Sequence, residues 1–283
     1  MDEHRDKFHV STMCAALGVS RSGYYEWRTR ATSRRAKEDN RLLQLIREVH
    51  QESRENYGDY KTWRALRDRG ETCGRHRVTR LRRLDGLVAK RVRRFRQTYA
   101  ARSNHESVAP NLLNRNFTAT RPNQVWVTDI TFVPTRRGWL YVAAVVDLFA
   151  RRIVGWAMSQ RIDQQLVLDA LHMAVKRRRP EPGLIIHSDQ GQQYVGAVYR
   201  ARLKHYGIVQ SMSRKGNCLD NAVAESFFSN LKNELVHHVV FEDRDAARTA
   251  IFEYMEVFYN RLRLHQSLGF TTPVDFEMMA ELA

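Results

Sequence analysis

The sequence predicts an α/β protein in which a basic, all-helical N-terminal region precedes a mixed sheet flanked by helices. Two observations predict this class. Before residue 100, apolar residues recur at helical spacing, whereas after residue 120 runs of β-branched and aromatic residues alternate with helical stripes. The later elements follow the order β-β-β-α-β-α-β-α-α, which indicates a mixed sheet with helices packed on it.

The first helices are expected on either side of a glycine turn. Residues 10–17 and 20–27 flank Gly18, with Ser11 and Ser20 as the expected N-caps. Helix, glycine-containing turn and helix is the helix-turn-helix pattern, but an ordinary helical hairpin has the same signature. The segment therefore leaves both DNA contact and simple packing open.

Three further helices are predicted before residue 90. The first, 36–51, has an apolar stripe, and the other two, 61–68 and 75–84, are separated by Gly70 and Gly74. The stripe residues are Leu42, Leu45, Ile46 and Val49. In helix 75–84 the expected inward residues are Val78, Leu81 and Leu84, and the expected outward residues are Arg75, Arg77, Arg80, Arg82 and Arg83.

The charge is large and unevenly distributed. The chain has a net charge of +16, and 39 of its 47 basic residues are arginine. Residues 1–110 hold 26 basic and 14 acidic residues, against 21 and 17 in residues 111–283. This excess favours a polyanionic partner bound by the first region, although a GC-rich genome would also favour arginine over lysine. The candidate DNA contacts are Arg75, Arg77, Arg80, Arg91, Arg93 and Arg94.

The second half is expected to begin after a polar linker at 100–120. Three strands at 125–133, 139–148 and 152–158 have short connections and predict an antiparallel meander. The remaining predicted elements are helix 163–178, strand 183–187, helix 194–206, strand 208–211, helix 222–236 and helix 245–259. Trp126 and Trp139 are expected in the core.

Composition excludes several classes of protein. The three cysteines lie far apart without a CxxC pair, which argues against a disulfide framework or a cysteine zinc site. The longest apolar run noted near the middle, 139–146, has eight residues and is too short to span a bilayer. The first ten residues show no secretory signal. We therefore expect a soluble intracellular protein with no membrane partner.

Three acidic residues occupy informative positions. Asp129 lies within a strand, Asp189 follows an apolar strand, and Glu225 lies early on a helix. A carboxylate inside a strand is costly unless it is paired or metal-bound. Three converging carboxylates suit two Mg²⁺ ions, with Mn²⁺ able to substitute, and such ions promote phosphodiester chemistry.

Other polar residues near these acids have structural explanations. Asp147 ends the second predicted strand and is the best decoy for a catalytic acid. Asp220 is expected to cap the helix that carries Glu225. His187 is expected to pack or to form hydrogen bonds at its strand end.

The three acids and their surroundings resemble a known family. Fifty-nine residues separate Asp129 from Asp189, and 35 separate Asp189 from Glu225. This arrangement is similar to that of the DDE transposases and retroviral integrases, and more narrowly to the second-frame (OrfB) product of the insertion-sequence-three family of bacterial transposases. The matching stretches are 126–131, 187–194, 211–217, Glu225 with Lys232, and the tail with 259–261, His265 and Pro273.

The resemblance implies fold, activity and partners. It implies an RNase H-like (ribonuclease H-like) core whose catalytic and metal-binding residues are Asp129, Asp189 and Glu225, with Lys232 on DNA phosphate. The implied domains are a helix-turn-helix-like DNA-binding region at 1–100, a linker at 101–120 and the catalytic core at 121–283. The paired zinc ligands of the retroviral N-terminal module have no counterpart here.

The implied activity is transposition. The protein is expected to bind transposon terminal repeats and target DNA, to cut a terminal strand in a metal-dependent reaction and to transfer the freed 3′-hydroxyl. It is expected to assemble as a homo-oligomer on DNA, with a first-frame (OrfA) product as partner or fusion. The resemblance also implies a bacterial cytoplasmic protein that is nucleoid-associated when bound to DNA. Two alternatives are a DNA-binding regulator with an inactive core and a nuclease that hydrolyses DNA without joining it.

Overall fold

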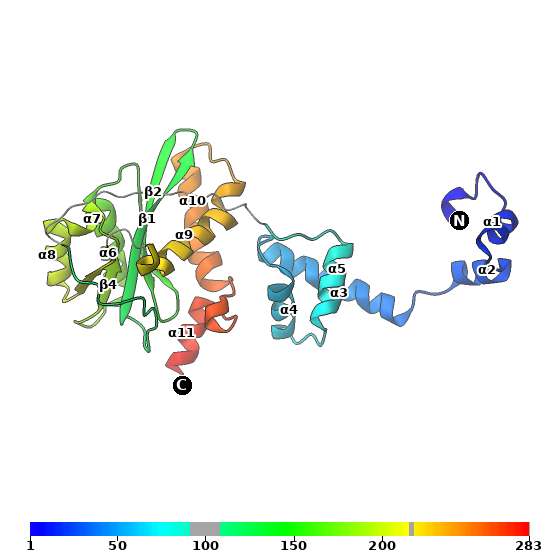
Figure 1. Cartoon of the computed structure of the whole chain (residues 1–283), viewed down its shortest axis with the longest axis horizontal. Helices are drawn as coiled ribbons and strands as arrows, with labels where there is room; N and C mark the ends of the chain where they lie inside the picture. Colours follow the sequence, from blue (N-terminus) through cyan, green and yellow to red (C-terminus); the bar gives the residue numbers. More distant parts are fainter. Residues whose placement is uncertain (91–107, 215–217, 283) are drawn as a thin grey trace.

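A computed structural model describes residues 1–90, 108–214 and 218–282 of the 283-residue chain. A helical hairpin comes first, a three-helix unit follows, and an α/β domain completes the chain (Figure 1). The helices are α1 (Val10–Leu17), α2 (Arg21–Thr29), α3 (Arg34–Glu52), α4 (Asp59–Asp68), α5 (Arg75–Leu84), α6 (Gln164–Arg178), α7 (Gln192–Val195), α8 (Ala197–His205), α9 (Ala222–Glu234), α10 (Arg244–Glu253) and α11 (Pro273–Glu281). The strands are β1 (Val125–Thr135), β2 (Gly138–Asp147), β3 (Ile153–Ser159), β4 (Ile185–Ser188) and β5 (Val209–Met212).

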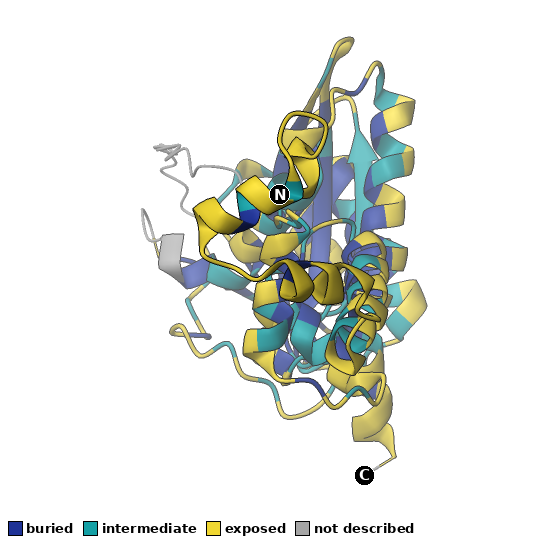
Figure 2. Ribbon diagram, turned by 90° about the vertical axis from the view of Figure 1, so that its right-hand side faces the viewer, coloured by how far each residue is buried: buried dark blue, intermediate teal, exposed yellow. Residues whose placement is uncertain are grey.

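The N-terminal hairpin is mostly exposed, as its yellow colour in Figure 2 shows. Ser20 caps α2 as predicted, since its Oγ accepts a hydrogen bond from the Gly23 amide at 3.0 Å. The prediction for Ser11 is wrong, because His9 occupies the N-cap of α1 and makes no side-chain cap.

The helices α3, α4 and α5 form a small unit with its own apolar core. Leu42, Ile46 and Val49 of α3 pack with Leu66 of α4 and Val78 of α5. The outward and inward faces of α5 differ from the prediction at its C-terminal end.

Leu84 and Arg82 exchange the places predicted for them on α5. Leu84 is 72% exposed and Arg82 only 5% exposed. The Arg82 guanidinium donates to Thr62 Oγ1 at 2.7 Å and to the Tyr57 carbonyl at 2.9 Å, which compensates for its burial. Leu84 lies in the last turn, beyond the reach of the bundle core.

The sheet has the order β3-β2-β1-β4-β5, with β4 and β5 parallel to β1 and the other pairs antiparallel. One face packs against α6, α7 and α8 through residues such as Trp126 and Ala170. The other face packs against α9, α10 and the segment after α10 through residues such as Val127 and Phe227. The helices α6 and α9 therefore lie on opposite sides of the strands in Figure 1.

Several predicted boundaries and one core residue need correction. Trp139 is 48% exposed at the outer end of β2, so its prediction as a core residue is wrong. The predicted helix 194–206 is divided at Gly196 into α7 and α8. The predicted helix 245–259 is α10 followed by a π-helix, η4 (Tyr254–Tyr259), and the sequence analysis gave no helix at α11.

The segment predicted as a linker packs against the core in its described part. The Leu112 amide donates to Ser211 Oγ at 2.9 Å beside β5, and Leu113 is buried. Among the described residues, no helix is long and apolar enough to cross a bilayer.

Candidate active site and DNA-binding surface

Parallel pairing of β1 with β4 brings Asp129 and Asp189 to the same level. Val127 is paired with His187, and each aspartate lies two residues beyond that pair. Side chains alternate between the faces of a strand, so Asp129 shares the face of Val127, against which α9 packs. The two residues are therefore neighbours, Asp129 in the middle of β1 and Asp189 just beyond the carboxyl end of β4.

Helix α9 brings Glu225 to the same place. Ala224, Phe227 and Phe228 are buried in the core beneath α9, and Glu225 lies on the exposed side in its first turn. The start of α9 is held to β1 because Asn221 Nδ2 donates to the Thr128 carbonyl at 3.3 Å. This tether lies next to Asp129 in the sequence.

The pKa shifts record the proximity of the three acids. Removal of water, together with the negative charges of Asp189 and Glu225, raises the pKa of Asp129 to about 8 against the opposing effects of the Ile130 amide and of Lys232. Desolvation also raises the pKa of Glu225, with a second contribution from Asp189. By surface area Asp129 is half-buried and the other two are exposed, so Asp129 is the acid least able to hold its charge alone.

Lys232 is the cation facing this cluster. It follows Glu225 by seven residues, two helical turns along α9. Its Nζ lies 4.8 Å from the ring centroid of Phe132 on β1, and its charge lowers the pKa of Asp129. Desolvation lowers the pKa of Lys232 itself, while Asp129 opposes that shift. The structure thus brings together all four residues that the sequence analysis grouped.

The loop after β4 is held by several hydrogen bonds. The Gly191 amide donates to Asp189 Oδ1 at 3.0 Å, and Gln190 Nε2 donates to the Ser213 carbonyl at 2.9 Å. His187 is buried between Ser211 Oγ at 2.8 Å and Ser213 Oγ at 3.1 Å, as its hydrogen-bonding role requires. These contacts fix the carboxyl end of β4, and with it Asp189, against β5.

The donor set suits a hard divalent cation that takes few protein ligands. Within the described residues, no three acidic, histidine or cysteine side chains are grouped closely enough to hold one ion together. Mg²⁺ does not need such a group, because it is usually held by one or two carboxylates with water and phosphate. Desolvation and neighbouring acidic charges raise the pKa values of Asp129 and Glu225, and a bound cation would offset both effects.

The two other acids considered in the sequence have structural roles. Asp147 accepts hydrogen bonds from the Asn123 amide at 2.8 Å and the Phe149 amide at 2.9 Å, as expected of a decoy. Asp220 does not cap α9, which corrects the prediction. It is fully buried and pairs with Arg214 at 2.9 Å and Arg115 at 3.1 Å, which lowers the pKa of its carboxyl.

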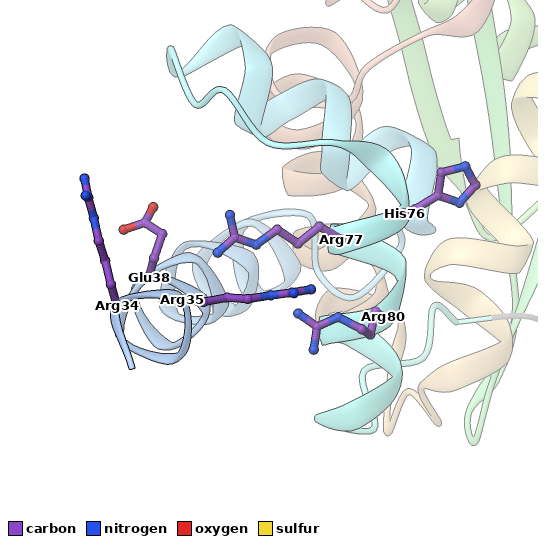
Figure 3. Close-up of a pocket in the computed structure, with 6 residues that line it drawn as sticks. All are labelled: Arg34, Arg35, Glu38, His76, Arg77 and Arg80. Atoms are coloured by element: carbon purple, nitrogen blue, oxygen red, sulfur yellow. The ribbon is translucent and has the colours of Figure 1, made fainter. Parts of the chain in front are cut away.

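A second cluster of charge lies between α3 and α5. Six residues line an open hollow of about 770 Å³, and Figure 3 shows Arg77 and Arg80 reaching from α5 toward α3. The lining residues are Arg34, Arg35, Glu38, His76, Arg77 and Arg80. We call this the basic hollow.

One aspartate organises the basic hollow. Asp39 accepts from Arg77 Nε at 2.7 Å and from Arg80 Nη2 at 2.6 Å, and these bonds lower the pKa of its carboxyl. Arg34 and Arg35 have no ion pair in the described part of the chain. Neither arginine was among the predicted DNA contacts, although two adjacent arginines at the start of a long helix are a signal visible in the sequence.

The remaining predicted DNA contacts are less concentrated. Arg75 lies outside the basic hollow, where it pairs with Asp59 at 3.0 Å and covers the Tyr60 ring at 5.2 Å. Arg91, Arg93 and Arg94 lie outside the described residues, so their predicted roles stay predictions.

Comparison with known proteins identifies the domains. Two family models described as an integrase core domain match residues 119–218 and 225–280, and a model described as an HTH-like domain matches residues 37–95. The HTH-like match therefore covers α3, α4 and α5 rather than the hairpin of α1 and α2.

Several relatives match almost the whole chain. A 31 kDa protein of insertion element IS600 from Shigella sonnei is 47% identical over 93% of this chain and 97% of its own length. The transposase InsF for insertion sequence IS3A from Escherichia coli (strain K12) is 39% identical over 98% of this chain and 96% of its own length. A solved structure, the HTLV-2 integrase catalytic core domain in complex with magnesium, shares 16% identity with a TM-score of 0.43, covering 56% of this chain and 98% of that one.

Proposed function

Since this chain belongs to the IS3 family of transposases and is a polynucleotidyl transferase with an RNase H-like integrase core, we propose that Asp129, Asp189 and Glu225 are its catalytic carboxylates. The observation that carries the proposal is the pairing of β1 with β4, which sets Asp129 level with Asp189, so that the charges of Asp189 and Glu225 contribute to the raised pKa of Asp129. Acids whose pKa values are strongly raised by burial and by a neighbouring charge are concentrated at functional sites.

We propose that the three carboxylates hold Mg²⁺ ions, two in number, and that Mn²⁺ substitutes. Such ions, when bound, stabilise the charge on the attacking and leaving oxygens of a phosphodiester. The chain's own contribution is positional. β1 and β4 fix the two aspartates, α9 fixes Glu225, and Lys232 faces the non-bridging oxygens of the strand to be cut.

We also propose that the three-helix unit binds transposon ends. The basic hollow takes a backbone phosphate, because Arg35, Arg77 and Arg80 supply more positive charge than Asp39 neutralises. The protein would act in the bacterial cytoplasm as a homo-oligomer on DNA, with a first-frame product as its partner or fusion. Phosphate contacts position the protein, and base contacts elsewhere on the unit would supply sequence preference.

A single gel assay tests the function. The full chain is incubated with labelled terminal-repeat duplex and Mg²⁺, and the products are separated by size. We expect nicked ends followed by joined strands, and no product in excess chelator. Nicks without joining would favour a nuclease, and binding without any product would favour a regulator.

A further inference from the structure

The three-helix unit is fastened to the catalytic domain through one buried tyrosine. The Tyr57 hydroxyl donates to the Leu262 carbonyl at 2.9 Å and accepts from the Leu264 amide at 2.7 Å. Tyr57 is 4% exposed and lies between α3 and α4. One side chain of the helical unit therefore satisfies two backbone groups of the core's C-terminal segment.

Neighbouring contacts extend this junction. Arg54 pairs with Glu253 at 2.6 Å, and its guanidinium lies 5.1 Å from the ring centroid of Phe258. Leu264 packs against the apolar core of the helical unit. We call this set of contacts the docking seat, with residues Arg54, Tyr57, Glu253, Phe258, Leu262 and Leu264. The seat includes part of the π-helix η4, and such segments recur at functional sites.

Arg263 carries the contact from the docking seat into the core. It stands between the two residues that Tyr57 holds, and its guanidinium binds Glu234 in a forked pair, with Nη2 donating to Oε1 at 2.7 Å and Nε donating to Oε2 at 2.9 Å. Arg263 is 7% exposed, and Tyr254 Oη donates to the same carboxylate at 2.8 Å. A forked pair fixes both distance and angle, so Glu234 is tightly placed.

Glu234 is the last residue of α9, the helix that carries Glu225 and Lys232. At its other end, α9 is tied to β1 through Asn221. The helix is 13 residues long and is therefore a short rigid rod between these two attachments. Loss of the attachment at Glu234 would let its C-terminal end shift and would carry Lys232 and Glu225 with it.

We propose that Tyr57, Arg263 and Glu234 form a positioning relay, by which seating of the three-helix unit on the core sets α9 and therefore Glu225 for strand cleavage. The relay rests on the catalytic role proposed above for Glu225. None of the three residues touches the reacting atoms. Their contribution is to make cleavage depend on a correctly seated DNA-binding unit.

The test uses Tyr57→Phe in the full chain, because phenylalanine keeps the ring and removes only the hydroxyl. The matched control is Tyr206→Phe, which removes a hydroxyl bonded to His172 Nδ1 at 3.2 Å on the opposite face of the sheet. At saturating DNA we expect Tyr57→Phe to slow cleavage about tenfold, the effect of two lost hydrogen bonds, and to raise the Mg²⁺ concentration for half-maximal cleavage. The dissociation constant for end DNA should change less than twofold.

Hydrogen exchange gives a readout that does not depend on activity. In the relay, Tyr57→Phe accelerates exchange of the backbone amides in α9 as well as at 262–264, whereas Tyr206→Phe leaves α9 unchanged. Glu234→Gln, which keeps the shape of the side chain and removes its charge, should act in the same way. This second variant carries the test if Tyr57→Phe does not fold.

Two results would overturn the relay. One is parental cleavage by Tyr57→Phe together with unchanged exchange in α9. The other is an equal loss of end binding and cleavage, which would mean that Tyr57 supports only DNA binding. Failure of the parent chain to cut DNA would instead refute the proposed function, and exchange in α9 would still decide whether the relay exists.

Discussion

The carboxylate site and the basic hollow are opposite in charge, but each gathers several side chains of one sign. Around β1 and β4, Asp129, Asp189 and Glu225 bring together negative charge that Lys232 offsets only in part. In the basic hollow, Arg80 and Arg77 form hydrogen bonds with Asp39, which lower the pKa of its carboxyl. The single negative charge of Asp39 is therefore shared by two arginines. Each site concentrates one sign of charge beyond what the chain neutralises. Under the proposed function, divalent cations would bind at the first site and DNA phosphate at the second.

The two sites differ in how firmly they are built. The aspartates are fixed by paired strands, and α9 is held at both ends. Most arginines of the basic hollow are exposed on long flexible side chains. We therefore expect changes at the first site to alter the rate of chemistry with little effect on affinity, and changes at the second to do the reverse.

The largest expected effect is at Asp129. Asp129→Asn should lower strand cleavage by about a thousandfold or more, because a catalytic metal contributes several kcal/mol to the barrier. End binding should stay within about threefold of the parent, since the basic hollow is untouched. The measurement is cleavage of labelled terminal-repeat DNA beside a binding isotherm on the same preparation.

A matched control for that variant is Asp169→Asn on α6, an exposed acid whose carboxylate accepts a hydrogen bond from Gln165 at 2.6 Å. It should cleave like the parent. Cleavage by Asp129→Asn at the parental rate would break the contrast, because the carboxylate site would then not be the catalytic one.

The next effect is on affinity. Replacing Arg35 by Gln should weaken binding of specific and scrambled duplexes equally and should reduce the salt slope by about 0.9, the value for one lost phosphate contact. Arg77→Gln and Arg80→Gln should act less strongly, since each already pairs with Asp39. The control is Arg136→Gln, an exposed arginine paired with Glu242 at 3.3 Å on the core. Selective loss of the terminal repeat would instead indicate base contact by Arg35.

Replacing Lys232 should lower the cleavage rate less than Asp129→Asn does, because Lys232 combines a position beside the carboxylates with a proposed phosphate contact. Lys232→Ala removes both a phosphate contact and the cation beside Phe132, so we expect about a tenfold loss of cleavage at saturating DNA and only a small change in melting temperature. Lys232→Arg should recover part of the rate because it restores the charge. Parental cleavage by the alanine variant would remove Lys232 from the site.

The sequence predicted what depends on local pattern. Alternating strands placed Asp129 and Asp189, and helical spacing placed Lys232 two turns from Glu225. The fold class and the order of the elements in the core were also predictable. Regular elements position all three acids, because Asp129 lies in the middle of β1, Asp189 follows β4 and Glu225 lies in the first turn of α9.

Long-range contacts explain the errors. Asp220 was expected as a cap but is buried by arginines that arrive from residues 115 and 214. Arg82 was expected outward, yet two acceptors from other segments surround it. The docking seat was invisible for the same reason, since Tyr57 and Leu262 lie 205 residues apart. Spacing along a helix does not reveal which distant segment covers it.

The smallest expected effect is a change in the melting temperature of the metal-free protein. It tests whether other groups of the chain compensate the negative charge of Asp129. The pKa of Asp129 is about 8 in the folded chain, above its ordinary value near 4. Between these two pH values the folded chain binds more protons than the unfolded chain, so the stability conferred by this group falls as pH rises through the window and then levels off.

Asp129→Asn has no such charge, so in chelator its melting temperature should match that of the parent near pH 4 and exceed it at pH 8. A gain of a few degrees is expected, because about 2–4 °C corresponds to each kcal/mol in a domain of this size. Added Mg²⁺ should narrow the gap by stabilising only the parent. Thermal melts in chelator at about pH 4, 6 and 8 provide the measurement. A lower melting temperature for Asp129→Asn than for the parent at pH 8 would mean that the chain already compensates this carboxylate. The carboxylate site would then hold no excess negative charge, and its contrast with the basic hollow would be lost.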